Sequence, residues 1–284
     1  MSTFESFKNT IEKDFFKHPV VTSNPYTQWF KQGWTDTEQL VDLITQFSVF
    51  SNHFLVVQVK RMVNASTEEG ERSARYILMN ECGVSIDSRT GSTEGRVFST
   101  SNAHLNWLRE IGALLGLGPM DLGQWEKGSE STHRFLQGLD RTYGNHDGQI
   151  GAGASFAIET WAASGIGHGP EAESKNFWKE LIVGIEGYNR NHRLPLGLEP
   201  LPLGFFQYHF EIESGHGANV WHELEETFHQ PGFDPKKFLR GGREALDAIH
   251  TFWIGLDQTR KSLERTEVRE KDCLAAINVA QWGM

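Results

Sequence analysis

Apolar residues recur at three- and four-residue spacings along most of the chain, whereas strictly alternating stretches are scarce. This is the period of an amphipathic α-helix, in which positions three and four apart share one face. The pattern therefore predicts an all-α protein, a compact bundle of about seven to nine helices. The expected helices cover residues 2–16, 37–63, 69–82, 102–117, 130–142, 153–164, 171–187, 200–229 and 235–262.

Segments rich in Gly, Ser, Thr and Pro separate these helices. Residues 83–101, GVSIDSRTGSTEGRVFSTS, predict an exposed loop whose length is typical of a lid or entrance. Residues 144–153, GNHDGQIGAG, interrupt the helical pattern again. Because the chain shows neither a repeat of fixed period nor a low-complexity tail, we expect residues 1–284 to form a single domain.

The composition supports a large core and an acidic surface. Nine Trp and nineteen Phe supply the apolar volume, and the formal net charge is -10. Such a surface repels polyanions, so we expect neither nucleic acid nor an acidic membrane as a partner. The least charged stretch, residues 43–59, is interrupted by polar side chains and predicts a core helix instead of a membrane span.

The cysteines and the N-terminus favour a cytoplasmic location. Cys82 and Cys273 are the only two cysteines, too few for a disulfide framework or a cysteine-ligated zinc site. The first residues, MSTFESFKNTIEKDFFKH, are charged throughout and lack the apolar stretch of a signal peptide.

Three candidate ligands lie in the segment FFQYHFEIESGHG. His209, Glu213 and His216 stand at i, i+4 and i+7, which places them on one face of a helix among apolar neighbours. The spacing suits a metal site, and it equally suits a hydrogen-bonded pair of core histidines. The set His222, Glu226 and His229 repeats the spacing thirteen residues later, after a rotation of roughly 220°, so we assign it to the surface.

Two isolated carboxylates add to this picture. Glu81 ends an apolar helix in YILMNECG, and Glu159 is the only acid in GASFAIETWAA. A pair of iron ions needs several carboxylates from facing helices, so both are candidates. The E-x-x-H matches at Glu130 to His133 and at Glu213 to His216 also permit a ferritin-like set, but Glu130 stands where a helix start already explains an acid.

The order of these segments resembles the haem-oxygenase-like superfamily, specifically its non-haem diiron oxidase and oxygenase branch. Thiaminase-like and pyrroloquinoline-quinone-synthase-like proteins are related to it. The resemblance covers roughly residues 10–260. It rests on His18-Pro19 before a helix and on WFKQGWTDTEQLVDLITQFSVFSNHF, YILMNECG, AHLNWLREIGALLGL, GASFAIETWAA and FFQYHFEIESGHG.

The resemblance implies a set of metal ligands, namely Glu81, His104, Glu159, Glu213 and His216. Three positions depart from the family pattern: His53 stands where a ligand glutamate is usual, Ser101 where some members place another, and Glu213 in place of Asp. His53 is therefore a further candidate ligand. His209 would orient a ligand from outside the metal's first coordination sphere.

The same resemblance implies an enzyme with two Fe(II) ions per chain and dioxygen as co-substrate. Its substrate would be a small amino-acid-like or fatty-acid-like molecule, changed by N-oxygenation, desaturation or oxidative carbon–carbon cleavage, and the protein would be a homodimer. Three alternatives stay open: a cofactorless quinone-synthase-like oxidase, a thiaminase-like hydrolase, and a helical binding protein without activity. The hydrolase needs an activated cysteine, whereas we expect Cys82 to be an inert core thiol.

Overall fold

In the computed structural model, residues 3–87, 90–163 and 176–281 are described, apart from the side chains of residues 213–220 and 267–281. Within these ranges the fold is all-α, as expected, with one isolated bridge between Val84 and Phe98. The α-helices are α1 (Phe4–Asp14), α2 (Pro19–Thr22), α3 (Pro25–Phe30), α4 (Thr37–Val63), α5 (Glu68–Glu81), α6 (His104–Leu114), α7 (Glu130–Arg141), α8 (Gly148–Ala162), α9 (Phe177–Tyr188), α10 (Gly204–Phe228) and α11 (Pro235–Gln281). Short 3-10 or π turns are η1 (Thr100–Asn102), η2 (Pro119–Asp121), η3 (Trp125–Lys127), η5 (Asn189–Arg193) and η6 (Leu194–Leu196).

The described ranges contain 11 α-helices, so the expected seven to nine was too low. The two additional helices, α2 and α3, are single turns that each begin with a proline at the first helical position. Proline fits there because its fixed φ suits the helix and its missing N–H would have had no partner. The side chains of His18 and Asn24 cap the two helices. Such short turns are invisible to a search for long amphipathic periods.

Two helix boundaries also differ from the expectation. The break expected at residues 144–153 ends earlier, because Asp147 caps α8 and the helix begins at Gly148. Glycines within α8 allow a close approach to α11, which a pattern search reads as a break. Helix α11 continues to Gln281 instead of ending near residue 262. The expected start of α9 at residue 171 lies outside the described residues.

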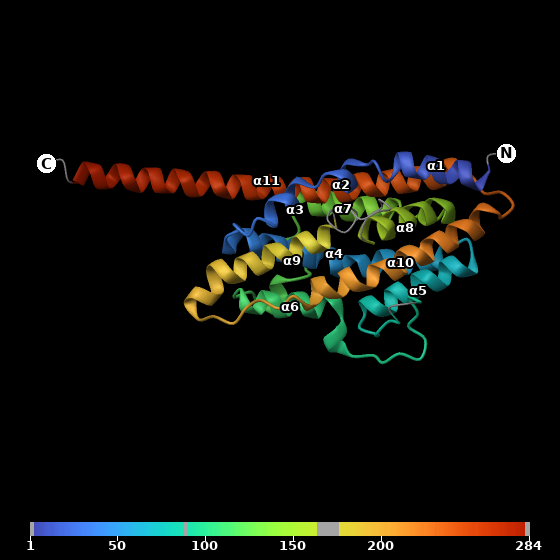
Figure 1. Ribbon diagram of the computed structural model, residues 1–284, viewed down its shortest axis with the longest axis horizontal. Helices are drawn as coiled ribbons and strands as arrows, with labels where there is room; N and C mark the ends of the chain where they lie inside the picture. The colour runs from blue at the N-terminus through green and yellow to red at the C-terminus, as the bar shows by residue number, and fades with distance from the viewer. Residues whose placement is uncertain (1–2, 88–89, 164–175, 282–284) are drawn as a thin grey trace.

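Helix α11 runs along one side of the whole molecule, and its C-terminal part projects beyond the other helices (Figure 1). It packs against α1, α2, α3, α4, α7 and α8. Helix α4 lies in the interior, where it also contacts α5, α6 and α7. On the side away from α11, α10 packs against α5, α6, α8 and α9. The space between α4, α8 and α10 is where side chains from six helices meet.

Helix α4 is the one described helix long and apolar enough to cross a membrane by length and composition. However, 56% of its apolar window is buried within the protein. Leu40, Leu43, Ile44 and Phe47 are among the residues with which it fills the core. The sequence-based prediction of a core helix is confirmed.

A buried ion pair connects α4 to α10. The Arg61 guanidinium donates to the Glu223 carboxylate, and the side chains are only 2% and 6% exposed. Because a charge left alone at this depth is costly, either partner strongly requires the other. The pair ties together the two helices between which the candidate site lies.

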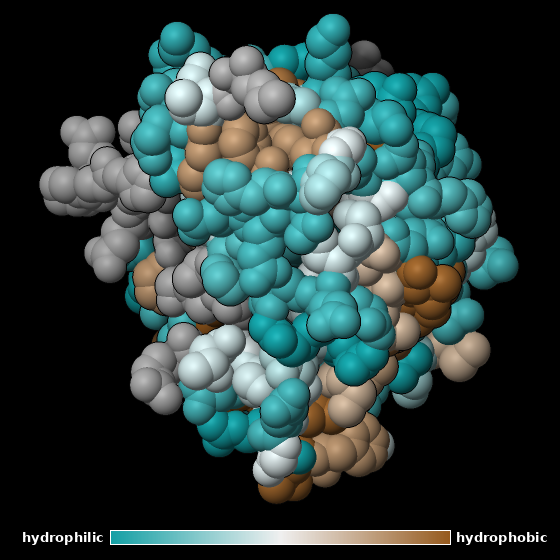
Figure 2. All heavy atoms as spheres, turned by 90° about the vertical axis from the view of Figure 1, so that its right-hand side faces the viewer, coloured by the Kyte–Doolittle hydropathy of each residue, from teal (hydrophilic) through white to brown (hydrophobic). Residues whose placement is uncertain are grey.

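Hydrophilic side chains cover most of the molecular end that carries α1 and the connection from α10 to α11 (Figure 2). The apolar areas on this face are small and lie between them. A charged, mixed surface of this kind agrees with the net charge of -10.

The Asp42 side chain of α4 is largely buried, and this burial raises the pKa of its carboxyl to about 6 from an ordinary 3.8. A hydrogen bond from Gln46 acts in the opposite direction. The folded chain therefore holds this proton more tightly than the unfolded chain does. This difference in pKa lowers the free energy of unfolding as the pH rises from about 4 to about 6. Above that range the free energy of unfolding falls no further from this cause.

We expect Asp42→Asn to raise the free energy of unfolding by up to about 3 kcal/mol near pH 7.5, because a shift of about two pKa units is removed. Near pH 4 the gain should almost vanish. Urea unfolding at the two pH values measures this. Glu38→Gln, at an exposed position in the first turn of the same helix, is the control and should change stability by less than about 1 kcal/mol. An equal gain from Asp42→Asn at both pH values would contradict the linkage.

Candidate metal centre

A tight turn brings the end of α5 next to the start of α6. Gly83 has a φ of 105°, and a Cβ there would lie 2.3 Å from the Ser99 carbonyl oxygen, so only glycine fits. The Ser99 N–H donates to the Gly83 carbonyl and closes the intervening loop. As a result Glu81, the last residue of α5, faces His104, the first residue of α6.

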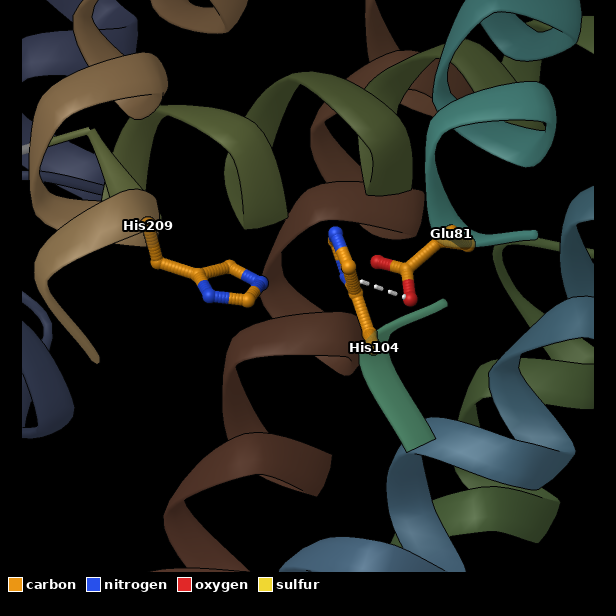
Figure 3. Close-up of side chains that lie close together, drawn as sticks. All are labelled: Glu81, His104 and His209. Atoms are coloured by element: carbon orange, nitrogen blue, oxygen red, sulfur yellow. Dashed lines mark ion pairs between the residues drawn. The ribbon is translucent and has the colours of Figure 1, made fainter. Parts of the chain in front are cut away.

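The third side chain comes from α10. His209 is buried, and its ring stacks on Trp178 of α9 at a centroid distance of 4.5 Å. Its Nδ1 donates to the Phe205 carbonyl one turn earlier, at 2.7 Å, so Nε2 is the nitrogen suited to a metal. Figure 3 shows Glu81, His104 and His209 pointing toward one another from three helices.

Their donor atoms converge as the ligands of one ion do. One ligand atom from each of Glu81, His104 and His209 lies within 4.8 Å of the others. His104 Nδ1 approaches Glu81 Oε2 to 2.8 Å, yet neither ring nitrogen of His104 has a hydrogen-bond partner, because the approach lacks hydrogen-bond alignment. Two donors that bind one metal at about 2.1 Å and at right angles lie about 3 Å apart. The spacing of Glu81 and His104 therefore suits two ligands of one ion, and His209 lies near enough to be a candidate third ligand.

A cavity of about 60 Å³ adjoins these three side chains. One water needs roughly 15 Å³ of such space, so the cavity holds several small species. Its polar lining is Ser51, Glu81, His104, Glu159 and His209. Its apolar lining is Phe47, Phe50, Phe54, Ile77, Ile158, Trp161, Ala162, Phe177, Trp178, Phe205 and Ile212.

The charges of this cavity favour a cation. Two carboxylates, Glu81 and Glu159, face it, and neither Lys nor Arg occurs among its described lining residues. Anions among apolar side chains are costly unless a cation or hydrogen bonds compensate them. Tyr143 donates a hydrogen bond to Glu159. Burial, followed by the charge of Glu159, raises the pKa of Tyr143 well above its ordinary value, so the hydroxyl keeps its proton.

The fold can be compared with known proteins. No family model matches the chain, and neither does any curated protein. A CADD-like protein of unknown function from Nostoc punctiforme is 18% identical; the match covers 90% of this chain and 95% of that one, with a TM-score of 0.59. A domain of unknown function from Shewanella denitrificans, described as having a haem-oxygenase-like fold, is 11% identical over 93% and 96% of the two chains, with a TM-score of 0.60. The fold is haem-oxygenase-like.

The haem-oxygenase-like fold confirms, for the architecture, the resemblance drawn from the sequence. At identities of 18% and 11% the likeness concerns the fold alone. One fold carries many activities, and the chemistry of the site determines which of them a protein has.

Within the haem-oxygenase-like bundle, three of the predicted ligands come together at one cavity: Glu81, His104 and Glu159. The predicted ligands Glu213 and His216 belong to α10, but their side chains lie outside the described part of the structure. His209 was predicted to orient a ligand. In the structure its own ring lies close enough to Glu81 and His104 to be a ligand itself. A sequence signal for this existed, because Phe205 and Ile212 mark a buried face on which His209 also lies.

His53 does not reach this cavity. Its ring lies 5.2 Å from that of Trp125, and it lines a separate groove with that residue. On α4 the cavity is lined by Phe47, Phe50, Ser51 and Phe54. Successive helical residues point about 100° apart, so a side chain at position 53 leaves this face. The α4 position that could offer a polar atom to the cavity is therefore Ser51.

The ferritin-like alternative is wrong. The His133 ring stacks on Trp125 at 4.2 Å, and its Nε2 bonds to the Trp125 carbonyl. Glu130 lies in the first turn of α7 after the Ser129 cap, and it pairs with Arg134 in solvent. Neither side chain lines the cavity. The structural explanation of Glu130 as a helix-start acid is confirmed.

The second histidine set lies on the surface, as expected. His222 and Glu226 are exposed and form an ion pair of 3.5 Å. With Glu69 they make a second group of three possible ligands, but Arg72 already pairs with Glu69. This surface group provides a control for the buried one.

Two further expectations change. Cys82 is exposed and does not belong to the core, and burial of part of its thiol, together with Glu81, raises its pKa. A protonated thiol outside the cavity does not support a thiaminase-like nucleophile. The loop at residues 83–101 was expected to be a lid or an entrance. Within its described part, Val84, Thr93, Glu94, Gly95, Arg96 and Phe98 line a surface groove with α5.

Proposed function

We propose that this protein is a non-haem iron enzyme that binds two Fe(II) ions per chain and uses dioxygen to oxidise a small molecule. The observation that carries the proposal is the convergence of Glu81, His104 and His209 around His104 nitrogens that have no hydrogen-bond partner. Two imidazoles and one carboxylate form the donor set typical of Fe(II) sites that activate oxygen. Such a set holds a ferrous ion and leaves coordination positions for other ligands.

The residues divide between two ions in this proposal. Glu81, His104 and His209 hold the first. Glu159 supplies a carboxylate to the second, and the resemblance adds Glu213 and His216. Bound iron would supply the electrons that activate dioxygen. The protein itself fixes the donors: the Phe205 carbonyl orients His209, and the stack on Trp178 keeps its ring in place.

The cavity wall supports oxidation of an apolar group. Trp161 and Phe177 stack at a centroid distance of 4.3 Å and form one rigid side of it. Such a wall excludes water and positions the hydrocarbon part of a substrate. We therefore propose an amino-acid-like or fatty-acid-like substrate, with N-oxygenation, desaturation or oxidative carbon–carbon cleavage as the reaction class. We further propose that the protein acts in the cytoplasm as a homodimer without a nucleic-acid partner.

Anaerobic titration with Fe(II), followed by desalting and metal quantification, tests the proposal. We expect about two irons per chain and an oxygen-dependent change in visible absorption when air is admitted. The same result is expected for His222→Ala, which removes the histidine of the surface group. A parent protein that retains no iron would overturn the proposal and favour a cofactorless or binding role.

A further inference from the structure

A buried row of hydrogen bonds leads from α4 to the cavity. Gln58 of α4 and Tyr143, which follows α7, are both fully buried. The Gln58 side-chain amide donates to the Tyr143 hydroxyl oxygen at 2.7 Å, and the Tyr143 hydroxyl donates to Glu159 Oε1 at 3.4 Å. Glu159 is 4% exposed and lines the cavity, so the row ends at the candidate metal centre.

At its outer end the row begins with the Gln58 amide N–H as the donor. A phenol has one proton to donate and oxygen lone pairs to accept. Because Gln58 gives its N–H to the phenol oxygen, the phenol proton is directed to Glu159. The contact of 3.4 Å is long for such a bond, and contacts of this kind commonly shorten once a ligand is in place. Tyr143 thus anchors one carboxylate oxygen and limits the rotation of the whole group.

We propose that Tyr143, oriented by Gln58, is a positioning residue that holds the Glu159 carboxylate toward the second metal ion and thereby sets the affinity of that ion. This inference rests on the proposed two-iron function. It concerns one ion only, because the group of Glu81, His104 and His209 is organised by other contacts, among them the Phe205 carbonyl. Loss of partners that orient a ligand typically weakens metal binding by 10- to 100-fold.

Calorimetric titration with cobalt(II) under anaerobic conditions, on the parent and on Tyr143→Phe, tests this inference. The parent should bind two ions. In the variant one ion should bind about 10- to 100-fold more weakly, while the affinity of the other is unchanged. Tyr26→Phe is the matched control, since Tyr26 is equally buried but lies in a stack with Phe30. It should bind both ions as the parent does.

Gln58→Leu provides a second variant, which keeps the phenol but removes the group that directs it. Gln58→Leu should weaken binding of the same ion, by a smaller factor than Tyr143→Phe does. A merely structural role of Tyr143 would lower thermal stability without separating the two affinities. Tyr143→Phe with both parental affinities, or a parent that binds only one ion, would overturn the inference. A parent that binds no ion would overturn the proposed function itself.

Discussion

His104→Ala is expected to weaken binding of the first metal ion by more than about 100-fold, beyond the loss typical of an outer partner. His104 is 2% exposed; its Nδ1 lies 2.8 Å from Glu81 Oε2, but neither ring nitrogen has a hydrogen-bond partner. Such an arrangement is unfavourable unless something else binds the nitrogens, because buried polar atoms normally have partners. Metal retained after desalting, and the rise of the melting temperature on adding Fe(II), measure the effect.

The matched control for this variant is His133→Ala. Like His104, which stacks on Trp107, His133 stacks on an aromatic ring, but that ring is Trp125, whose carbonyl also bonds to His133 away from the cavity. It should retain metal as the parent does. Without metal, His104→Ala should melt below the parent, because the packing of a buried ring and its ion pair with Glu81 are lost, so metal retention is the deciding measurement. If the variant binds iron normally, His104 is not a ligand.

Gly153→Ala is expected to lower the free energy of unfolding by about 3 kcal/mol, at the upper end for overpacking. A Cβ at Gly153 of α8 would lie 1.9 Å from the Phe238 carbonyl oxygen of α11. Across the same crossing, a Cβ at Gly241 would lie 2.1 Å from the Ile150 carbonyl oxygen. Both close contacts are with backbone atoms, which cannot move aside as the end of a flexible side chain can. The gain in helix propensity, about 1 kcal/mol, is too small to compensate.

Urea unfolding of Gly153→Ala measures this loss, and Gly204→Ala is its control. Gly204 is also a helical glycine, but an added Cβ there meets no atom within 4 Å. Its replacement should leave stability unchanged or slightly raised. Because α8 also carries Glu159, Gly153→Ala should weaken metal binding as well. If Gly153→Ala has the same free energy of unfolding as the parent, α8 and α11 can move apart at little energetic cost.

The sequence predicted those elements whose signal is local. Long amphipathic periods gave α4, α5 and α10, and isolated acids in apolar helices indicated Glu81 and Glu159. Helices α2 and α3 did not appear among the expected amphipathic helices because they are too short to show a helical period, and α8 was expected to begin too late because its first turns are rich in glycine. In α8, Gly148, Gly151 and Gly153 resemble a break in the pattern, although the first begins the helix and the last permits the crossing with α11.

The candidate ligands also include some that the sequence could indicate and some that depend on how the helices pack. The resemblance identified His104, which has no local signature, because a family pattern includes the arrangement of distant helices. It also indicated His53, although the stripe of Phe47, Phe50 and Phe54 on α4 points elsewhere. The role of His209 depends on how α10 is rotated relative to α6, which follows from packing and not from spacing along one helix.

The position of α11 has a consequence for how the chain is made. The ribosome delivers α1 to α10 first, yet α1, α2 and α3 pack on α11, as do α4 and α8. Until α11 emerges, the apolar core helix α4 and the glycine face of α8 lack their cover. The fold can therefore be completed only after α11 has been synthesised, and until then the uncovered apolar surface is open to aggregation.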